Sequence, residues 1–290
     1  ALENESAQLL ALAIKEGAQF NRLLTIGRQA LLVSPKELDL ILKNNPSIDK
    51  SYINKSKNQK YADNFFKALG ANELDVMDSS NYECASIIHD LNLPLKKINK
   101  KYDLVFDGGS LEHIFNIPTA IKNYISLVKS GGRFIAHLPA NNHMGHGFYQ
   151  FSPEFFQRIF STKNGFTIEK LILVEYGPIK KWFEVKDSYK SGTTTHTINK
   201  YPIYMYIQAR KDREVVPFNK WPVQYIYDKM WDQNNQSQTK DSAFKSFGAR
   251  IKRNLLNIIP RVARSIDSLY HSSLNPLYSL RNKRMFKKIK

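Results

Sequence analysis

The sequence predicts an α/β fold built around a mostly parallel sheet. Short apolar runs alternate with stretches whose apolar residues recur at helical spacing, and this alternation is typical of parallel sheets. Two Ser-Pro pairs, at Ser34 and Ser152, mark helix starts. The last two apolar runs have no helix between them, so we expect an antiparallel addition at one edge of the sheet.

The helix start at Ser34 is the most clearly marked element in the first part of the chain. Ser34 can cap the helix, Pro35 suits the first helical position, and Glu37 lies where a capping box requires an acid. In chain order we expect a helix over 1–17, a strand over 22–27, the Ser34 helix bounded by Pro46, a loop over 51–60 and a helix over 61–71.

The middle of the chain contains most of the predicted strands. Gly131 is expected to stop the helix whose apolar face includes Ile121 and Tyr124. Residues 178–200 are polar, which favours an insertion or a flexible loop. In chain order we expect strands over 73–78, 85–92 and 102–109, a helix over 117–132, a strand over 133–140, a helix from Ser152, and strands over 167–177 and 201–211.

Four residues lie where predicted strands end: Gly27, Asp78, Asp90 and Asp107. In open α/β sheets ligands bind beyond the carboxyl ends of the strands. The sequence therefore predicts a binding site at this edge of the sheet. Asp78 and Asp90 could instead be turn residues at the strand ends.

The stretch 101–139 resembles the class I S-adenosylmethionine-dependent methyltransferases. It has an aspartate entering a strand (Asp103), the pair Glu112-His113 after that strand, a helix ending in Lys-x-Gly-Gly at 129–132, and a further strand. The resemblance covers roughly residues 20–211. It implies a Rossmann-like, mostly parallel seven-stranded sheet with helices on both faces and an antiparallel last strand, and S-adenosyl-L-methionine as cofactor.

The resemblance also implies which residues bind the cofactor. Asp78 would accept hydrogen bonds from the ribose hydroxyls, and Asp90 would bind the adenine amino group beside Leu91. The loop from Asp107 to Ser110 would pass the methionine part, where adjacent glycines allow close approach. The implied binding residues are Gly27, Arg28, Gln29, Asp78, Ser79, Asp90, Leu91, Asp107, Gly108 and Gly109.

The first motif departs from the family pattern. Thr25 stands where the family has an acid, and Gly27 is the one glycine of a turn that usually holds several. S-adenosylmethionine has no pyrophosphate that needs a glycine-rich cradle. We expect Arg28 to pair with the methionine carboxylate and Gln29 to hydrogen-bond near it.

The stretch 137–154 begins in a predicted strand and runs past its end, where the substrate is expected. Methyl transfer needs an aligned acceptor and a base for its proton, and histidine titrates near neutrality. We expect His146 or His143 to be that base, with His113 as the third candidate. A histidine in a loop can instead be exposed to solvent or form a hydrogen bond within the protein, with no part in catalysis. His137 is expected to be structural.

No metal site is expected near these histidines. His143 and His146 are three residues apart, but no cysteine or clear third ligand accompanies them. Glu112 is expected to cap or orient its neighbours rather than to react.

The basic character of the chain is concentrated in its last 50 residues. Of a formal net charge of +17, residues 241–290 carry 12 Lys and Arg against two Asp, a net of +10. Apolar residues from Phe244 to Ile258 recur at helical spacing between the basic ones. Such a segment could dock on an anionic membrane surface, pack on the preceding domain, or bind nucleic acid, and we favour them in that order.

We therefore expect a methyltransferase domain over 1–215, a linker over 216–240 and a basic amphipathic extension over 241–290. No apolar run reaches 18 residues, the first residues do not read as a signal peptide, and the single cysteine, Cys84, fits a reducing cytoplasm. The expected location is cytoplasmic, with docking at the inner face of the membrane through the extension.

The expected function is methylation of a sugar hydroxyl or sugar substituent in cell-surface polysaccharide assembly. The acceptor would be a glycan or a nucleotide- or lipid-linked sugar. Two alternatives remain open. One is methylation of RNA, which the positive charge suggests. The other is a non-catalytic relative with an altered cofactor site, which serves as an assembly partner.

Overall fold

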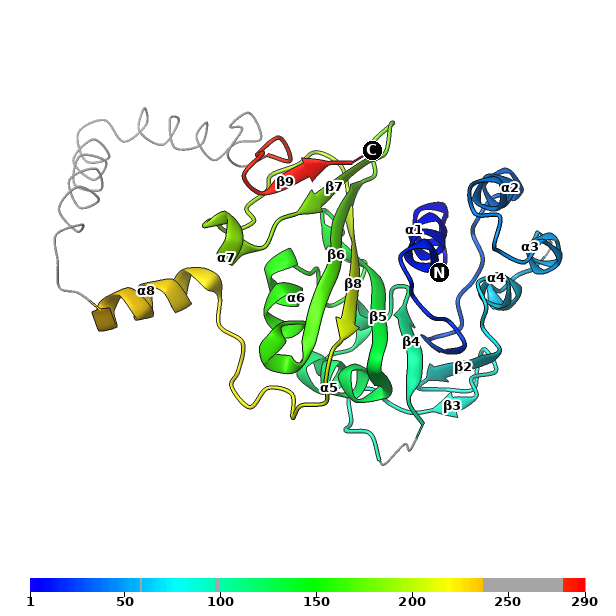
Figure 1. The fold of residues 1–290 in the computed structure, drawn as a ribbon, viewed down its shortest axis with the longest axis horizontal. Helices are drawn as coiled ribbons and strands as arrows, with labels where there is room; N and C mark the ends of the chain where they lie inside the picture. The colour runs from blue at the N-terminus through cyan, green and yellow to red at the C-terminus, as the bar shows by residue number, and fades with distance from the viewer. Residues whose placement is uncertain (58, 97–99, 237–278, 290) are drawn as a thin grey trace.

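The computed structural model describes residues 1–57, 59–96, 100–236 and 279–289. In these residues one sheet runs through the centre in the strand order β3-β2-β1-β4-β5-β8-β6-β7-β9 (Figure 1). The strands are β1 (Arg22–Ile26), β2 (Glu73–Asp78), β3 (Ile87–Ile88), β4 (Tyr102–Asp107), β5 (Val128–Asn141), β6 (Phe166–Glu175), β7 (Lys181–Val185), β8 (Ile203–Lys211) and β9 (Phe286–Lys288).

The sheet confirms the predicted Rossmann-like arrangement. Neighbours from β3 to β5 are parallel, and β8 lies antiparallel between β5 and β6. The described part of the sheet has nine strands rather than the seven predicted. The two extra strands, β7 and β9, are added antiparallel beyond β6.

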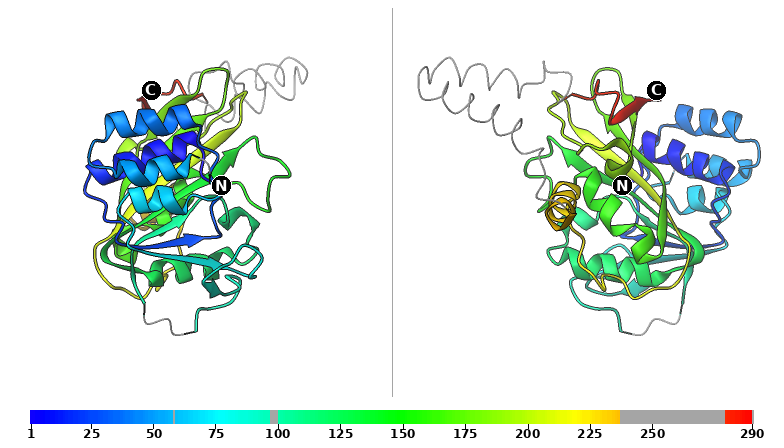
Figure 2. Two further views of the ribbon diagram at one scale, coloured as in Figure 1. Left: turned by 90° about the vertical axis from the view of Figure 1, so that its right-hand side faces the viewer. Right: turned by 60° about the vertical axis from the view of Figure 1, so that its left-hand side comes forward.

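Helices cover both faces of the sheet, as predicted. Figures 1 and 2 show α1 to α4 on one face and α5 and α6 on the other. Each face buries its own apolar cluster, which removes a large apolar area from water. The helices are α1 (Asn4–Lys15), α2 (Pro35–Asn44), α3 (Lys50–Ser56), α4 (Asp63–Ala68), α5 (Ile117–Leu127), α6 (Pro153–Ile159), α7 (Ser188–Ser191) and α8 (Tyr225–Gln236), with short 3-10 turns η1 (Leu111–His113) and η2 (Thr162–Asn164).

Both predicted Ser-Pro helix starts are confirmed. Ser34 Oγ accepts from the backbone N–H of Glu37 at 3.2 Å, and Ser152 Oγ accepts from the N–H of Phe155 at 3.3 Å. In each helix proline takes the first position, where its missing N–H removes no hydrogen bond. Such caps contribute about 1 kcal/mol each to stability.

Three predictions about single elements are wrong. The strand expected over 85–92 is reduced to β3, Ile87–Ile88, so Asp90 lies two residues beyond its end. The polar stretch 51–60 is largely helical, because Asp49 caps α3 by accepting from Ser51 N–H at 2.8 Å and Ile53 is buried under it. The helix that we expected to reach Gly131 ends at Leu127, since the next residue already pairs with β4. The φ of +81° at Gly131 belongs to a turn in the first part of β5.

The polar stretch 178–200 is not a simple loop, because it contains β7 and α7. Strand β9, from the end of the described chain, pairs with β7. Met285 and Phe286 are buried in the apolar cluster on the α5 side of the sheet, which we call the main apolar cluster. The last described residues therefore pack on the domain. The rest of the predicted amphipathic segment, residues 241–278, lies outside the described residues. Helix α8 lies within the predicted linker 216–240.

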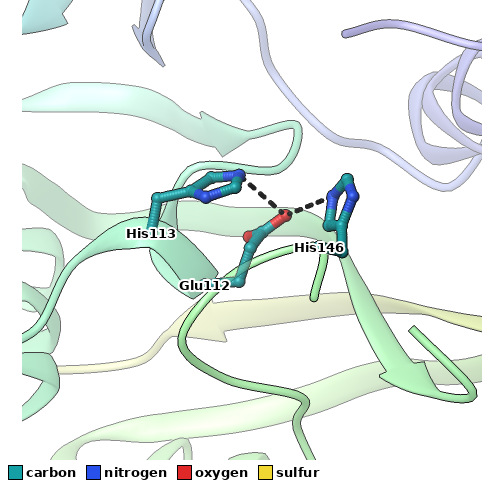
Figure 3. A group of neighbouring side chains, drawn as sticks. All are labelled: Glu112, His113 and His146. Carbon is teal, nitrogen blue, oxygen red and sulfur yellow. Dashed lines mark ion pairs between the residues drawn. The ribbon is translucent and has the colours of Figure 1, made fainter. Parts of the chain in front are cut away.

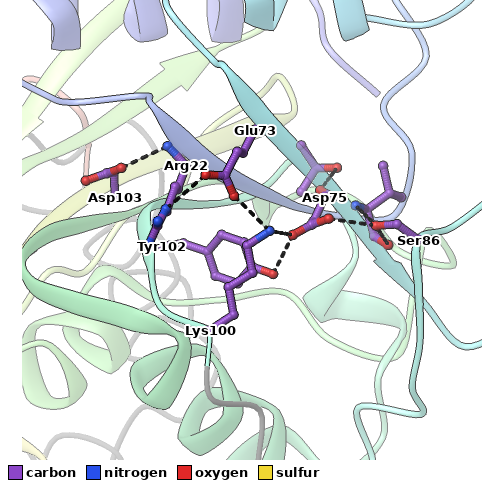
Figure 4. A network of polar contacts seen from close by, with 9 residues as sticks. Arg22, Glu73, Asp75, Ser86, Lys100, Tyr102 and Asp103 are labelled. Carbon is purple, nitrogen blue, oxygen red and sulfur yellow. Dashed lines mark hydrogen bonds and ion pairs between the residues drawn. The ribbon is translucent and has the colours of Figure 1, made fainter.

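The amino ends of β1, β2 and β4 are joined by paired charges (Figure 4). Asp75 accepts from Lys100 Nζ at 2.6 Å and from Tyr102 OH at 2.8 Å. Glu73 pairs with Arg22 at 3.2 Å and with Lys100 at 3.1 Å. We call Arg22, Glu73, Asp75, Lys100 and Tyr102 the amino-edge network. It fixes the register of these strands on the side away from the predicted site.

Asp103, which matches the methyltransferase pattern in the sequence, also joins elements at this edge. Its carboxylate accepts from the backbone N–H of Arg22 at 2.8 Å and pairs with Lys129. Asp103 therefore ties β1 to the segment that follows α5, and its part in the motif is structural.

Candidate functional site

Gly27 forms the turn at the carboxyl end of β1. Its φ of +66° lies in the left-handed region that favours glycine. A Cβ at this position would lie 3.4 Å from Ser110 Oγ and 3.8 Å from Asp78 Oδ2. The ends of β1, β2 and β4 therefore meet at Gly27, which is where the sequence places the binding site.

The two acids predicted to hold the cofactor differ in their surroundings. Asp78 accepts through Oδ1 from Ser80 N–H at 3.2 Å and from Ser79 Oγ at 3.3 Å, while Oδ2 lies nearer Gly27. Asp90 accepts from the backbone N–H and the side-chain amide of Asn92, and these bonds hold its pKa below the ordinary value. Asp90 thus stabilises its own turn, which is the alternative left open by the sequence.

Leu91, expected beside the adenine ring, is buried in the main apolar cluster. Only 6 % of its surface is exposed, so its side chain is largely covered by the protein itself. Its position beside Asp90 is as expected, but most of its contact surface is already used in the core.

Arg28 and Gln29 contact the protein rather than project freely from the turn. The Arg28 guanidinium lies 4.3 Å from the centre of the Tyr61 ring and 3.3 Å from Asp63. Gln29 is buried and donates through Nε2 to the Ile26 carbonyl at 2.8 Å. Our expectation that they meet the methionine part of the cofactor has no support in these contacts. Both residues shape the Gly27 turn.

Asp107 lies at the carboxyl end of β4, as expected, and its carboxylate is engaged within the protein. Its buried carboxylate accepts from the N–H groups of Gly109, Ser110 and Leu111 at 2.7 to 3.1 Å, and from Tyr124 OH at 2.9 Å. Burial raises the pKa of Asp107, and these bonds act against that shift. Asp107 therefore holds the loop after β4 from inside.

The adjacent glycines of this loop are required by the protein's own side chains. A Cβ on Gly108 would lie 2.2 Å from Gln29 Oε1, so any larger residue would force the buried Gln29 side chain to move. Gly109 has a φ of +103°, and a Cβ there would lie 3.2 Å from Glu112 Oε1. The loop thus separates the Gly27 turn on one side from Glu112 on the other.

Glu112 lies at the centre of the site (Figure 3). Its fully buried Oε1 is 3.5 Å from His146 Nε2 and 3.9 Å from His113 Nε2. Neither carboxylate oxygen has a hydrogen-bond partner among the described residues. Burial, together with the charge of Asp107, raises the pKa of Glu112 to about 8. We call Glu112, His113 and His146 the Glu112 cluster.

The backbone fixes the His146 loop against Glu112. The Glu112 carbonyl accepts from the N–H groups of Phe148 at 2.8 Å and Tyr149 at 3.2 Å. A Cβ on Gly147 would lie 2.9 Å from the same carbonyl oxygen, so a glycine is needed for this approach. His146 is thereby placed next to a residue 34 positions earlier in the chain.

The other predicted histidines extend the site toward β8. The His143 ring lies 5.8 Å from that of His146 and 4.3 Å from that of Tyr204. His137 stacks on the Tyr204 ring at 4.8 Å, and its Nδ1 hydrogen-bonds with Ser6 Oγ at 2.9 Å. Burial lowers the pKa of His137 to about 3, so this histidine is neutral at physiological pH.

Burial also lowers the pKa of two more accessible histidines. For His113 and His143, desolvation is the larger cause and the nearby His146 adds to it. Both are therefore neutral near pH 7, as a proton acceptor or a metal ligand must be. The predicted His113 and His146 lie together, and Glu112, expected to orient its neighbours, faces both. The contact between Glu112 and His146 was not predicted. The signal was present in the Glu112-His113 pair and the glycines around His146.

Exposed apolar side chains stand around this cluster. Phe115 and Phe148 are 72 % and 69 % exposed, and their rings contact each other edge to face at 5.9 Å. Met144, in the same loop as His146, is 93 % exposed. Apolar groups in this position can bind an acceptor by contact with its apolar face.

Comparisons with known proteins match this fold at low identity. No protein-family model matches the chain, and no curated protein matches it in sequence. The chain is similar to the solved structure of TehB from Haemophilus influenzae, with 11 % identity and a TM-score of 0.36 over 70 % of this chain and 61 % of TehB. The N-methyltransferase NodS from Bradyrhizobium japonicum WM9 gives 12 % identity and 0.38, over 72 % of this chain and 94 % of NodS.

A third similar structure is the trans-methyltransferase CalH in complex with SAH, with 13 % identity and a TM-score of 0.40. The match covers 71 % of this chain and 55 % of CalH. The chain thus spans about three fifths of TehB and little more than half of CalH. The strand order and the antiparallel β8 give this chain the Rossmann-like fold that its resemblance to class I methyltransferases implies.

Proposed function

We propose that this chain is an S-adenosylmethionine-dependent methyltransferase whose acceptor binds at the Glu112 cluster. The observation that carries the proposal is the Gly108–Gly109 turn. On one side it borders the Gly27 turn with Gln29, and on the other it borders Glu112. Donor and acceptor would therefore lie beside the same two glycines, as a direct displacement requires.

The residues at the Gly27 turn suit the cofactor. Asp78 offers a carboxylate to the ribose hydroxyls, and the half-buried Gly27 leaves the backbone of its turn partly accessible. When bound, the cofactor supplies a methyl group on a positively charged sulfur. The acceptor oxygen forms a bond to that methyl carbon as the carbon–sulfur bond breaks, and the acceptor's proton passes to a basic group of the protein.

His146 is the group that we propose as the proton acceptor. Its side chain is 44 % exposed and its Nε2 faces the buried Glu112 carboxylate at 3.5 Å. An acid behind a histidine orients the ring, and in its ionised form, which Glu112 gains as pH rises through its raised pKa of about 8, it stabilises the positive charge that the ring takes up. Such proton transfer contributes roughly 10²- to 10⁴-fold to a rate.

The acceptor that we propose is a sugar hydroxyl or a sugar substituent of a cell-surface glycan. Phe115 and Phe148 support this choice, because exposed aromatic rings beside the cluster can lie against the apolar face of a sugar. Docking on the inner face of a membrane through 241–290 belongs to the same proposal. Among the described residues, no helix is both long and apolar enough to cross a bilayer.

Calorimetry with S-adenosylmethionine tests the proposal. We expect micromolar binding that Asp78→Asn weakens at least tenfold, because the ribose loses a charged acceptor. Asp90→Asn is the matched control, since its carboxylate is already engaged by Asn92, and we expect a smaller loss. Absence of binding by the wild type would contradict the proposal and favour a non-catalytic relative.

The acceptor is tested separately, by following release of S-adenosylhomocysteine with a panel of nucleotide-linked sugars and with RNA. Turnover with a sugar acceptor supports the glycan proposal. Turnover with RNA alone, falling steeply as salt is raised, would overturn it.

A further inference from the structure

We propose that Glu112, His113 and His146 bind a divalent transition-metal cation, for which zinc is the best match. One carboxylate oxygen and two imidazole Nε2 atoms converge here, and these three atoms all lie within 4.8 Å of one another (Figure 3). Imidazole and carboxylate are ligands that zinc commonly takes, and two histidines with one acid form a known catalytic set.

The buried carboxylate is the first argument for a cation. Glu112 has 0 % of its surface exposed, and neither of its oxygens has a hydrogen-bond partner among the described residues. A buried polar group without partners costs free energy, and natural proteins usually supply a partner. The two imidazoles that face Glu112 both turn a ring nitrogen toward the same carboxylate oxygen, which suits the position between them to a positive ion.

The distances are the second argument. Zinc lies about 2.0 to 2.2 Å from nitrogen and oxygen ligands, so two tetrahedral ligand atoms lie roughly 3.3 Å apart. Glu112 Oε1 is 3.5 Å from His146 Nε2 and 3.9 Å from His113 Nε2. All three atoms lie within 4.8 Å of one another, so rotations of the two imidazole rings toward Glu112 are needed to bring them to ligand distances.

The third argument is that the ligands are held in place. The Glu112 carbonyl fixes the His146 loop through Phe148 and Tyr149, and His113 N–H donates to the Ser110 carbonyl at 3.0 Å. Ligands whose backbone is fixed lose little entropy when they bind. In the sequence, His146 lies close to His143 and far from Glu112, so the set of three ligands becomes visible only in the structure.

The cluster also leaves a position for a substrate atom. His113 and His146 have side chains that are 51 % and 44 % exposed, so the open side of a bound cation would face solvent. Catalytic zinc sites have three protein ligands and keep a fourth position open. This consequence rests on the proposed function: an acceptor hydroxyl at that position would lose its proton more readily, and His143 would be the nearest imidazole outside the cluster.

Metal binding is tested with the full chain, purified without a histidine tag and freed of metal by a chelator. Calorimetric titration with zinc chloride should give about one ion per chain. We expect His146→Ala, His113→Ala and Glu112→Gln each to weaken binding at least tenfold, since each removes a ligand atom. His143→Ala is the matched control and should retain the wild-type affinity.

Circular dichroism separates loss of a ligand from loss of fold. A variant that fails to bind zinc but keeps the wild-type spectrum supports the proposal. Zinc binding that is absent in the wild type, or reduced equally by His143→Ala and His146→Ala, would overturn it. Titration of the same samples with S-adenosylmethionine keeps the two proposals apart: cofactor binding without zinc binding leaves a methyltransferase with His146 as its base.

Discussion

The amino and carboxyl edges of the sheet differ in whether an acidic side chain there has hydrogen-bond partners. At the amino edge, Asp75 has Lys100, Tyr102 and Ser86 as partners. At the carboxyl edge, the Glu112 carboxylate is more deeply buried and has no hydrogen-bond partner among the described residues. The first edge is organised for stability, and the second keeps polar atoms available at a cost in stability.

The difference extends beyond these two acids. Gln29 Oε1 and His137 Nε2, also near the carboxyl ends of the strands, are buried atoms without hydrogen-bond partners in the described part of the chain. Unsatisfied buried groups cluster at sites of function, because a ligand or reacting group satisfies them only when it is bound. The comparison therefore supports placing the proposed site at the carboxyl edge.

The largest expected effect is on catalysis at the carboxyl edge. His146→Ala should lower methyl transfer by roughly 10²- to 10⁴-fold, because either a base or a metal ligand is lost. The half-exposed ring makes few packing contacts, so thermal unfolding should stay close to that of the wild type. Release of S-adenosylhomocysteine measures the first quantity and calorimetry the second. Full activity in this variant would contradict the proposed role of His146 at the carboxyl edge.

The next prediction concerns Asp75 at the amino edge, where we expect a loss of stability rather than of activity. Asp75→Ala leaves Lys100 and Tyr102 without their shared partner and should cost roughly 2 to 3 kcal/mol of unfolding free energy. Affinity for S-adenosylmethionine should be unchanged in the folded protein. Denaturant unfolding checks the stability. A loss of cofactor affinity with unchanged stability would show that the two edges are not separate.

Acid should destabilise the carboxyl edge first. The pKa of buried His137 is lowered to about 3, so below pH 6.5 the unfolded chain takes up a proton that the folded chain does not. The stability conferred by the neutral ring is therefore lost as pH falls from about 6.5 toward 3, at no more than ~1.4 kcal/mol per pH unit. His137→Gln should flatten this slope in unfolding titrations.

The amino edge should respond only at lower pH. Burial alone would raise the pKa of Asp75, but hydrogen bonds from Lys100 and Tyr102 hold it below its ordinary value of 3.8. Its contribution is present above that value and is lost as pH falls through the lower folded pKa. Asp75→Asn should therefore alter the pH dependence below pH 4 and leave the slope between pH 4 and 6.5 unchanged.

The smallest expected effect is a gain in stability. In protein freed of metal, Glu112→Gln should raise the unfolding free energy by about 1 kcal/mol, because it removes a buried acid that lacks hydrogen bonds. Urea unfolding of the two proteins at pH 8 measures the difference. A clear destabilisation instead would mean that Glu112, like Asp75, serves mainly to hold the fold.

Local signals predicted much of this molecule. The caps at Ser34 and Ser152 and the convergence of Gly27 with Asp78 follow from short stretches of sequence. What could not be predicted depends on residues far apart in the chain. Arg28 contacts Asp63, which lies 35 positions away, and Phe183 pairs in the sheet with Lys288.

The part played by Glu112 is the clearest example of this limit. The pair that Glu112 forms with His113 can be seen in the sequence. Its other partner, His146, comes from the loop after β5. Periodicity cannot show that Gly147 allows that loop to approach the Glu112 carbonyl. The orienting role of Glu112 was predicted from the sequence, but its contact with His146 depends on how the chain folds.

A crystal structure with S-adenosylhomocysteine tests the central claim most directly. We predict the ribose hydroxyls at Asp78 and the sulfur atom on the Gly109 side of the Gly27 turn, facing the Glu112 cluster. An acceptor atom between the sulfur and His146 would then have room at the roughly 3 to 3.5 Å that a reacting pair requires. Binding elsewhere, or with the sulfur turned away from Glu112, would contradict the account.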